Sequence, residues 1–481
     1  MSGWLDHLVL RRPRPLDAVA KSADTVTFAL RISTVTIRNL DAGVHAGLLA
    51  LDTESISVGH AVRTAREVLP AADVQRLLRE LGRLFVRGAF SVAVEDGEET
   101  LCELEPSSAS AVARFGLSLD EWDRCYRLSR LVLIRRHEDG LVVEGLATTT
   151  RMAIHRTELT AVLGALHEPA DETTAARQAP ELPGPVLTAC LRLMQAGGLI
   201  GRVDGEGLLP EDRDPDLMMR DPHDLFLHNR SRVGLTTDAI GGTFRFAGVR
   251  PPLPAIHPPW TGRPVALPEV DLDRLTRTDL PLAAAMERRR SRREWADRPL
   301  TLEELGEFLF RVFRIKSFMP ADPADPQSYE AALRPIPSAG ASGDIEVYVA
   351  AARISGIGRG LFHYDPARHV LTEVTGAGFP VTTIIQMAQQ SAGIPAEPPA
   401  LIVLASRFGR LAWKYEGLSY AATLKNVGVA YAAMYLAATA MDLAACGLGA
   451  GESAAFANAT KLAPHVESSV GEFMIGPAVP E

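Results

Sequence analysis

The feature that most constrains the fold of this chain is an apolar segment near its C-terminus. Residues 427–441 are about fifteen in number, are mostly alanine and other apolar side chains, and end at Asp442. A segment of this length and composition is too short and too weakly apolar to span a bilayer, which takes about 20 apolar residues. A helix that is apolar on most faces is instead typical of a protein core. We therefore expect this helix inside a globular domain and no transmembrane segment.

The last two hundred residues have the pattern of a mixed α+β domain. From about Leu282 onward, helix-like and strand-like segments alternate, and Leu401–Ala405 reads as a buried strand. Thr301 and Glu304 have the spacing of a capping box at the start of a helix. We expect one domain over residues 281–481.

The first two hundred residues look like a loose duplication, with modules over 1–115 and 116–205. Each has strand-like segments and finishes with an apolar helix, a short turn and a strand; the helices fall within 74–92 and 186–203. Residues 131–146 predict a β-hairpin that turns at Asp139-Gly140. This order predicts two winged-helix-like modules.

Winged helices often bind DNA, but this chain carries 59 acidic and 50 basic residues, a net charge of −9. The second candidate recognition helix offers only Arg192 as a basic residue. A DNA-reading helix needs a basic face, so we favour docking of a peptide or protein over DNA binding, with a purely structural role as the other alternative. We expect neither nucleic acid nor membrane as a partner.

The length and cysteine content of the chain limit the number of domains and the kinds of site that we expect. A chain of 481 residues suggests two to four domains. Its four cysteines lie far apart and form no CxxC or Cys/His cluster, so we expect no metal site and no disulfide framework. The first residues lack the apolar core of a signal peptide, which predicts a cytoplasmic protein.

Residues 206–280 are rich in proline and aspartate and predict a connecting region. Within it, residues 223–232 mix apolar and charged side chains, and we expect them to form a helix that docks on the following domain.

Two segments of the C-terminal domain are candidates for binding an anionic, flat ligand. Five arginines surround Ser291 within residues 288–293, and guanidinium groups with a hydroxyl make a good phosphate clamp. The loop Ser338-Ala339-Gly340-Ala341 has small side chains that would let a ring lie against the backbone. Each has an ordinary alternative, because a basic run is usually a solvated face and a small-residue loop is often only a turn.

Several motifs in this order resemble the SagB-type dehydrogenases, the flavin enzymes that oxidise azolines in ribosomal peptide natural products. The likeness is clearest to the oxidases of cyanobactin and thiopeptide pathways and covers about 200 residues. The matching elements are Arg289-Arg290-Ser291 with Arg293, the loop Pro337-Ser338-Ala339-Gly340-Ala341, the hairpin at 360–366, Lys414-Tyr415, the LKNVG run at 424–428 and the LGAG run at 448–451.

The resemblance implies a nitroreductase-like fold and a homodimer with FMN at the subunit interface. In such a protein Arg289, Arg290, Ser291 and Arg293 would hold the phosphate of FMN. The loop Pro337, Ser338, Ala339 and Gly340 would lie along its ring, and Gly449 and Gly451 would let backbone amides approach the phosphate end.

The chain departs from the family pattern at two places. After the small-residue loop the family often has an aromatic residue and a proline, where this chain has Ser342, Gly343 and Asp344. Within the apolar helix, Ala432-Ala433 replaces the family's usual Gln-Asn or Gln-Thr pair.

Lys414 and Tyr415 are the candidate catalytic residues. Only five of the 50 basic residues are lysines, so a lysine here suggests a role that arginine cannot fill. Burial can lower the pKa of a lysine toward neutrality, which would let Lys414 act as a base, while Tyr415 could orient the substrate or share the proton. An exposed loop pair without catalytic function is the alternative.

The resemblance therefore implies an FMN-dependent enzyme that oxidises thiazolines or oxazolines to thiazoles or oxazoles in a precursor peptide. Its partners would be that azoline-containing peptide and a cyclodehydratase of the same pathway. Two alternatives stay open at this point: an NAD(P)H-dependent nitroreductase of small molecules, and a non-catalytic adaptor that holds the precursor peptide.

Overall fold

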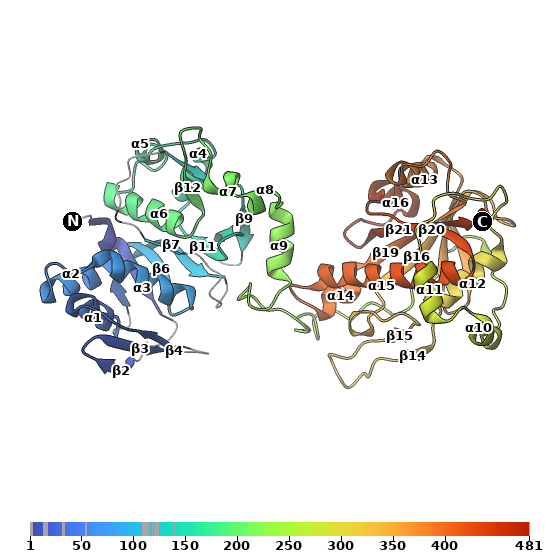
Figure 1. Cartoon of the computed structure of the whole chain (residues 1–481), viewed down its shortest axis with the longest axis horizontal. Coiled ribbons are helices and arrows are strands. Elements are labelled where there is room, and N and C mark those ends of the chain that lie inside the picture. The colour runs from blue at the N-terminus through green and yellow to red at the C-terminus, as the bar shows by residue number, and fades with distance from the viewer. Residues whose placement is uncertain are drawn as a thin grey trace. The chain divides into compact units, whose positions relative to one another are not determined.

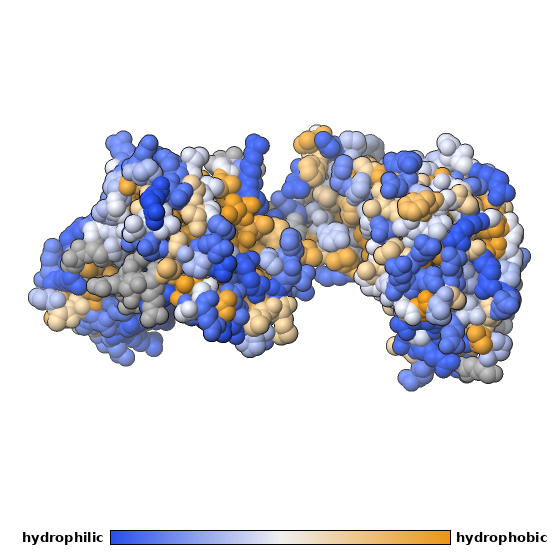
Figure 2. All heavy atoms as spheres, turned by 90° about the horizontal axis from the view of Figure 1, so that it is seen from above, coloured by the Kyte–Doolittle hydropathy of each residue, from blue (hydrophilic) through white to orange (hydrophobic). Residues whose placement is uncertain are grey.

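The computed structural model of the chain describes residues 3–12, 18–30, 34–52, 55–107, 115–117, 119, 125–137 and 140–480. Contacts divide it into two compact units, residues 1–239 and 240–481 (Figure 1). Among the residues that the structure describes, no helix is both long enough and apolar enough to cross a membrane. On the face shown in Figure 2, hydrophilic residues cover most of the surface and hydrophobic residues form smaller areas among them.

Unit 1 is organised on an antiparallel sheet in the order β5-β1-β6-β7-β11-β10-β9. The strands are β1 (Leu8–Arg11), β5 (Ser55–Ser57), β6 (Ser91–Asp96), β7 (Glu99–Pro106), β9 (Val132–His137), β10 (Gly140–Gly145) and β11 (Thr150–Ile154). β9 and β10 form the expected hairpin, with His137 opposite Gly140, while its turn at 138–139 lies outside the described residues. Smaller sheets join β2 (Ala18–Ser22), β3 (Thr25–Ala29) and β4 (Thr34–Ile37), and β8 (Tyr126–Leu128) with β12 (Ile200–Arg202).

The helices of unit 1 follow the order expected from the repeated pattern. α3 (Val74–Val86) and α6 (Gly184–Ala196) are the two apolar helices, and each is followed by a turn and a strand, as predicted. The others are η1 (Gly3–His7), α1 (Ala42–Leu49), η2 (Ala50–Asp52), α2 (Val58–Val68), α4 (Glu158–Ala165), α5 (Glu172–Ala176), α7 (Pro210–Arg213), α8 (Pro215–Met218) and α9 (Pro222–Arg230).

The two halves of unit 1 are not separate globules. β7 of the first half pairs with β11 of the second, and one hydrophobic core runs from Trp4 to Ile200. A boundary near residue 115 therefore falls within a shared sheet, and the assignment of two winged-helix-like modules stays a prediction.

The expected helix near residue 223 exists as α9 and has contacts within unit 1. Asn229 Nδ2 donates to the Leu146 carbonyl oxygen at 2.8 Å, and Asp238 pairs with both Arg151 and Arg230. These contacts place the helix with the sheet of unit 1, whereas we expected it to dock on the following domain. The reason is the carboxylate of Asp238, which two arginines of unit 1 hold. The limits of a 206–280 connecting region stay a prediction.

Unit 2 is a seven-stranded antiparallel sheet between two layers of helices. Its order is β13-β18-β17-β16-β19-β21-β20. The strands are β13 (Pro264–Ala266), β16 (Ile345–Ala351), β17 (Gly360–Asp365), β18 (Val370–Gly376), β19 (Ala400–Arg407), β20 (Leu443–Gly447) and β21 (Glu467–Pro477). β19 is buried along its whole length, as its apolar sequence predicts. β14 (Ser317–Met319) and β15 (Ala331–Leu333) form a separate ribbon.

α12 (Leu302–Phe313) and α15 (Ser419–Ala440) share one core with the sheet, and α13 (Phe379–Ala392) and α16 (Ser453–Thr460) form a second core on its other face (Figure 1). The capping box that starts α12 is confirmed, since Glu304 N donates to Thr301 Oγ1 and Thr301 N donates to a Glu304 oxygen. Shorter helices are α10 (Leu272–Thr278), α11 (Leu282–Arg288), η3 (Ala339–Ala341) and α14 (Phe408–Lys414).

The apolar segment 427–441 lies almost entirely within α15, but the helix is buried on one side only. Val427, Ala430 and Met434 are in the core, whereas Tyr420 and Leu424 are 46% and 41% exposed. Gly428 and Ala432 continue this exposed row at a spacing of four residues. The helix thus has an open apolar stripe (Tyr420, Leu424, Gly428 and Ala432), contrary to the expectation of burial on most faces.

A buried ionic cluster holds the start of unit 2 against its sheet. Glu346 of β16 is 1% exposed, and it pairs with His363 at 3.1 Å and with Arg407 at 3.4 Å. Arg407 also donates to the Pro254 carbonyl oxygen. Burial by itself would raise the pKa of Glu346, but the hydrogen bond and charge of His363, with the charges of two arginines, lower it to about 2.

We expect Glu346→Gln to reduce the free energy of unfolding of unit 2 by roughly 3–5 kcal/mol at pH 7, because it leaves the buried Arg407 guanidinium without its carboxylate partner. A carboxylate with a lowered pKa stabilises the fold above its ordinary pKa of 4.5, and this contribution is lost as the pH falls toward about 2. The variant and wild type should therefore converge in acid. Urea unfolding between pH 7 and pH 3 measures this, and Glu397→Gln, which breaks an exposed pair with Arg359, should cost under about 1 kcal/mol. Equal losses of unfolding free energy in the two variants would contradict the role of Glu346 as the carboxylate of a buried ionic cluster.

Candidate functional site

Lys414 is the last residue of α14, which begins directly after β19, an interior strand of the sheet. Its Nζ donates to the hydroxyl of Tyr329 at 2.6 Å. Tyr415 follows as the C-cap of the helix in an extended conformation. Both members of the predicted Lys-Tyr pair are half-buried, so the pair is not an exposed loop in this fold.

The small-residue loop meets this pair at Gly340. Gly340 has φ +58°, a conformation that glycine adopts without strain. A Cβ atom at this position would lie 2.6 Å from Lys414 Nζ and 2.5 Å from the Tyr415 hydroxyl. A side chain at this position would displace the ends of Lys414 and Tyr415, so glycine allows this close approach. The structure thus brings together two motifs that are 74 residues apart in the sequence.

The protonation of Lys414 differs from our expectation. Burial acts to lower its pKa, but the hydrogen bond and charge of Tyr329, with a smaller contribution from Tyr415, outweigh burial and raise the pKa. The expectation of a pKa lowered toward neutrality is therefore wrong. The physical reason is that Tyr329, which the sequence did not single out, accepts a hydrogen bond from the ammonium group.

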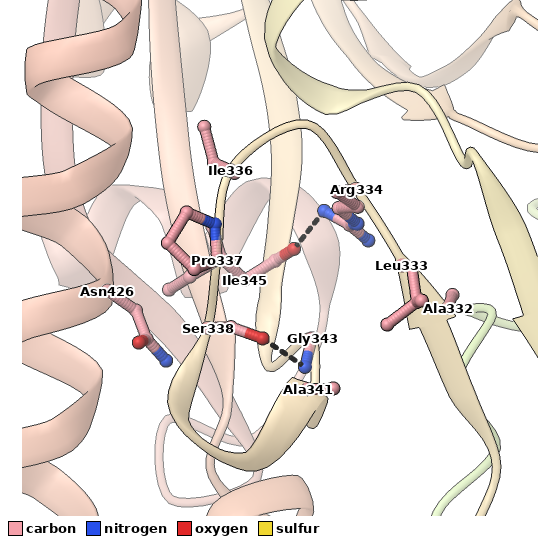
Figure 3. A pocket seen from close by; sticks show the side chains of 10 residues that line it. All are labelled: Ala332, Leu333, Arg334, Ile336, Pro337, Ser338, Ala341, Gly343, Ile345 and Asn426. Atoms are coloured by element: carbon pink, nitrogen blue, oxygen red, sulfur yellow. Dashed lines mark hydrogen bonds between the residues drawn. The ribbon is translucent and has the colours of Figure 1, made fainter.

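The loop lines a cavity of about 190 Å³ (Figure 3). Its lining residues come from β15, the loop and α15: Ala332, Leu333, Arg334, Ile336, Pro337, Ser338, Ala341, Gly343, Ile345 and Asn426. Within the loop, Gly343 N donates to Ser338 Oγ at 3.1 Å, and Arg334 donates to the Ile345 carbonyl oxygen at 2.9 Å. Ser342 Oγ is buried and has no hydrogen-bond partner within the described part of the chain.

Asp344, one of the departures from the family pattern, is the fully buried anchor of this loop. Its carboxylate accepts hydrogen bonds from Ser406 at 2.9 Å, Thr423 at 3.0 Å and Asn426 at 2.6 Å. Asn426 in turn accepts from the backbone N–H of Ala339 at 3.0 Å. A polar network therefore fixes the loop, and α15 carries two of its members.

The arginine cluster lies near the other end of α15. Ser291 Oγ is 2.9 Å from the Tyr435 hydroxyl, and the Arg289 guanidinium lies over the Tyr435 ring at 5.3 Å. Asn426 and Tyr435 are nine residues apart on one helix, so about 13.5 Å of helix axis separates the loop from the cluster. Arg289, Arg290 and Arg293 are exposed.

Arg292 has a different environment within the same run. Its backbone N–H donates to Ala445 in β20, and its side chain contacts Asp442 and the Val479 carbonyl oxygen. Arg292 thus joins the cluster to the sheet, and these structural contacts account for one of the five arginines in the run.

The two glycines of the LGAG run are in unlike surroundings. A Cβ at Gly449 would meet nothing within 4 Å, whereas one at Gly451 would collide with the carboxylate of Glu472. Burial raises the pKa of Glu472 to about 7. Close packing thus explains why Gly451 is a glycine, and a phosphate role for either glycine stays a prediction. The second family departure, Ala432-Ala433, places Ala432 on the exposed stripe of α15.

Comparison with known proteins adds family information. The nitroreductase family model matches residues 286–476. The cyanobactin oxidase model matches residues 126–237.

Residues 286–476 are a nitroreductase-family domain.

The chain thus contains a nitroreductase-family oxidoreductase domain and a segment that the cyanobactin oxidase model matches, and the resemblance to the SagB-type enzymes is confirmed. A protein of Methanocaldococcus jannaschii assigned to the nitroreductases is 26% identical over 190 residues, which are 39% of this chain and 83% of that protein.

Two solved structures are similar to parts of the chain. A nitroreductase from Ralstonia eutropha JMP134 has 23% identity and a TM-score of 0.36, and covers 51% of this chain and 100% of its own. A chain of the Escherichia coli microcin synthetase complex, solved with a truncated pro-peptide bound, has 16% identity and a TM-score of 0.33. It covers 45% of this chain and 85% of its own. The family-model matches carry the family assignment.

Sequence reasoning assigned no role to four residues of the site. Tyr329 and Phe244 contact Lys414, and neither belongs to a motif that the sequence singled out. Asn426 lies inside the LKNVG run but had no role assigned to it. Asp344 was visible only as a departure from the family pattern, and a lone acidic residue before a buried strand was the available signal. Within the described ranges, no group of His, Cys, Asp or Glu side chains could hold a metal ion.

We expect Asp344→Ala to lower the free energy of unfolding by about 1–3 kcal/mol or more, because buried hydroxyl and amide donors lose their acceptor. It should also free the Ala339 amide, which Asn426 no longer positions. Amide hydrogen exchange of the 338–341 peptide measures the second effect, and Asn426→Ala should show the same faster exchange. Asp442→Ala, which removes an exposed carboxylate, is the control that should leave the loop unchanged. Unaltered exchange in Asp344→Ala would contradict the anchoring role.

Proposed function

We propose that this chain is an FMN-dependent dehydrogenase that oxidises thiazoline or oxazoline rings to azoles in a ribosomally synthesised precursor peptide. The observation that carries the proposal is the contact of Gly340 with Lys414 and Tyr415 inside a nitroreductase-family domain. The cyanobactin-oxidase match in the same chain supports a peptide substrate.

The residues present suit FMN. Three exposed arginines with Ser291 offer donors for a phosphate, and the loop 337–340 offers a small-residue edge along a cavity for a flat ring. The nitroreductase family, with a solved member in complex with FMN, supports this cofactor. Arg289, Arg290, Ser291 and Arg293 would hold the phosphate, and Pro337, Ser338, Ala339 and Gly340 the ring. When bound, FMN supplies a hydride acceptor, the part of the chemistry that side chains cannot perform.

The chain's own residues must remove the proton. Lys414 Nζ and the Tyr415 hydroxyl converge on the backbone of Gly340, where a ring held by the loop would have its edge. A lysine can give up its proton and then accept one, whereas arginine stays protonated. Because the pKa of Lys414 is raised, azole formation should increase with pH in the alkaline range.

A homodimer is part of the proposal. The open stripe of α15 (Tyr420, Leu424, Gly428 and Ala432) presents apolar and small side chains on the helix that also carries Asn426. Exposed apolar area of this kind marks an interaction surface, and small residues let two helices approach closely. A second copy packed there would lie beside Tyr435, which contacts Ser291 and Arg289 and follows Ala432 by three residues on the same side of the helix. A place beside the proposed phosphate clamp is expected for a cofactor site between subunits.

Unit 1 is proposed to dock the precursor peptide or a cyclodehydratase partner. The cyanobactin-oxidase match lies within this unit, and the net charge of −9 disfavours nucleic acid. Winged-helix-like modules would supply such docking faces. The helix–turn–strand order of α3 with β6 and α6 with β12 supports this view.

The direct test is mass spectrometry of an azoline-containing precursor peptide incubated with the full chain and FMN. Oxidation removes two hydrogens, so each ring should lose about 2 Da. Turnover of a nitroaromatic with NAD(P)H and no change in the peptide would favour a small-molecule nitroreductase. Peptide binding without bound flavin would favour an adaptor.

We expect Arg289→Ala combined with Arg293→Ala to weaken FMN binding at least tenfold, because each charge-assisted hydrogen bond to phosphate contributes roughly 1.5–3 kcal/mol. Quenching of flavin fluorescence on titration measures the affinity. Arg288→Ala removes a neighbouring exposed arginine outside the proposed clamp and should bind FMN as the wild type does. Equal affinity in the double variant and the Arg288 control would refute the clamp.

We expect Lys414→Ala to keep FMN but to slow azole formation by about 10²-fold or more, the usual scale for an acid–base group. Lys414→Arg should be almost as slow, since arginine keeps the charge but cannot accept a proton at neutral pH. Tyr415→Phe should cost less if the hydroxyl only orients the substrate. Azole yield against time is measured at equal flavin occupancy, with Lys425→Arg as the control. Near-normal rates in Lys414→Arg would place the base elsewhere.

A further inference from the structure

Lys414 lies among aromatic side chains from three separate segments of unit 2. Its Nζ is 4.8 Å from the centre of the Tyr329 ring, 5.2 Å from that of Tyr415 and 5.5 Å from that of Phe244. Rings at these distances attract an ammonium group through their electron-rich faces. Tyr415 is adjacent in the chain, but Tyr329 and Phe244 are 85 and 170 residues away.

The hydroxyl of Tyr329 has two partners, and their directions are fixed. It donates its proton to the Gly340 carbonyl oxygen at 2.5 Å, and it accepts a proton from Lys414 Nζ at 2.6 Å. A phenol has one proton to donate, so toward Lys414 it can act only as an acceptor. Tyr329 therefore joins the lysine to the same glycine that limits the space around it.

We propose that Tyr329 is a positioning residue of the site, whose hydroxyl bridges Lys414 Nζ and the Gly340 carbonyl oxygen and so restricts the lysine lone pair to the two tetrahedral directions that point away from Tyr329. A neutral lysine has two N–H bonds and one lone pair. With one N–H directed at Tyr329, the lone pair must point away from that oxygen. The inference rests on the proposed role of Lys414 as the base.

The segment around Phe244 supports this arrangement from the other side. Residues 240–255, which we call the strap, run along α14, where Phe244 N donates to the Lys414 carbonyl oxygen and Trp413 Nε1 donates to the Arg250 carbonyl oxygen. The Trp413 ring also packs edge-on against both Phe244 and Tyr329. The end of α14 is thus held by the strap on one side and by Tyr329 on the other.

Other charged groups near Lys414 are engaged elsewhere. Glu416 pairs with Arg245 of the strap, and Arg410, one turn earlier on α14, donates to the carbonyl oxygens of Ser342 and Glu330. Tyr329 is therefore the side chain whose removal should change the protonation and orientation of Lys414 most directly.

The test measures the reactivity of Lys414 itself, without flavin or peptide. The full chain is treated with acetic anhydride across a range of pH, and acetylation of each lysine is followed by peptide mass spectrometry. Exposed Lys316, Lys425 and Lys461 serve as references in the same digest. Only a deprotonated amine reacts, so the curve of acetylation against pH reports the pH at which Lys414 loses its proton.

We expect Tyr329→Phe to move the Lys414 curve to lower pH, because the hydrogen bond that favours the ammonium form is lost. At a fixed pH of about 8, Lys414 should then react roughly threefold to tenfold faster relative to Lys425, since one pKa unit changes the deprotonated fraction about tenfold. Tyr420→Phe, an exposed tyrosine on α15, should leave the ratio unchanged. If Tyr329→Phe does not fold, Tyr329→His is tested instead, because its ring also offers a nitrogen acceptor. The acetylation curve of Lys414 in this variant should lie at lower pH than in the wild type, but not as low as for a lysine without any such hydrogen bond.

A Lys414 curve in Tyr329→Phe that coincides with the wild type, in a folded protein, overturns the inference. With the azoline peptide, the same variant should show a lower kcat at little change in KM, with the rising part of its pH profile moved to lower pH. If the wild type oxidises no azoline, the proposed function fails, while the acetylation curves still decide the role of Tyr329.

Discussion

The approach of the Gly340 backbone to Lys414 and Tyr415 is the contact on which the site depends. Glycine allows it, because Gly340 has φ +58° and a Cβ atom there would lie under 3 Å from the ends of both side chains and would displace them. The approach also needs the loop to stay in place, which the hydrogen bond from Ala339 to Asn426 achieves. A fully buried carboxylate, Asp344, then fixes Asn426. The geometry near the lysine is therefore set by a buried carboxyl group directly before β16.

α15 connects the parts of this site. Its first half carries Thr423 and Asn426 toward Asp344, and its second half carries Tyr435 toward Ser291. One rigid helix thus sets the distance between the small-residue loop and the arginine cluster. Asn426 lies on the buried side of this helix, whereas Tyr435 follows Ala432 of the open apolar stripe by three residues and lies on the same side. A second copy packed on the stripe would therefore lie beside the arginine cluster.

Local patterns in the sequence predicted local structure well. The capping box of Thr301 and Glu304, the hairpins and the buried strand β19 each depend on neighbouring residues, and each was found as expected. The nitroreductase-like fold was predicted from several motifs that occur in a specific order along the chain. Contacts between distant segments were not predictable, because nothing in a single sequence pairs Tyr329 or Phe244 with Lys414. The raised pKa of Lys414 and the shared sheet of unit 1 were missed for the same reason.

The protonated state of Lys414 in the free protein bears on how the proposed reaction could be controlled. Aromatic faces and the Tyr329 hydroxyl both favour the ammonium form, and Lys414 also ends a helix, where the backbone dipole favours a cation. A base that is charged when the site is open cannot remove a proton there. Covering the half-exposed lysine with a flavin ring and a peptide would remove water, and loss of hydration disfavours the charged form. In the proposed enzyme, substrate binding would thus itself convert Lys414 into a base.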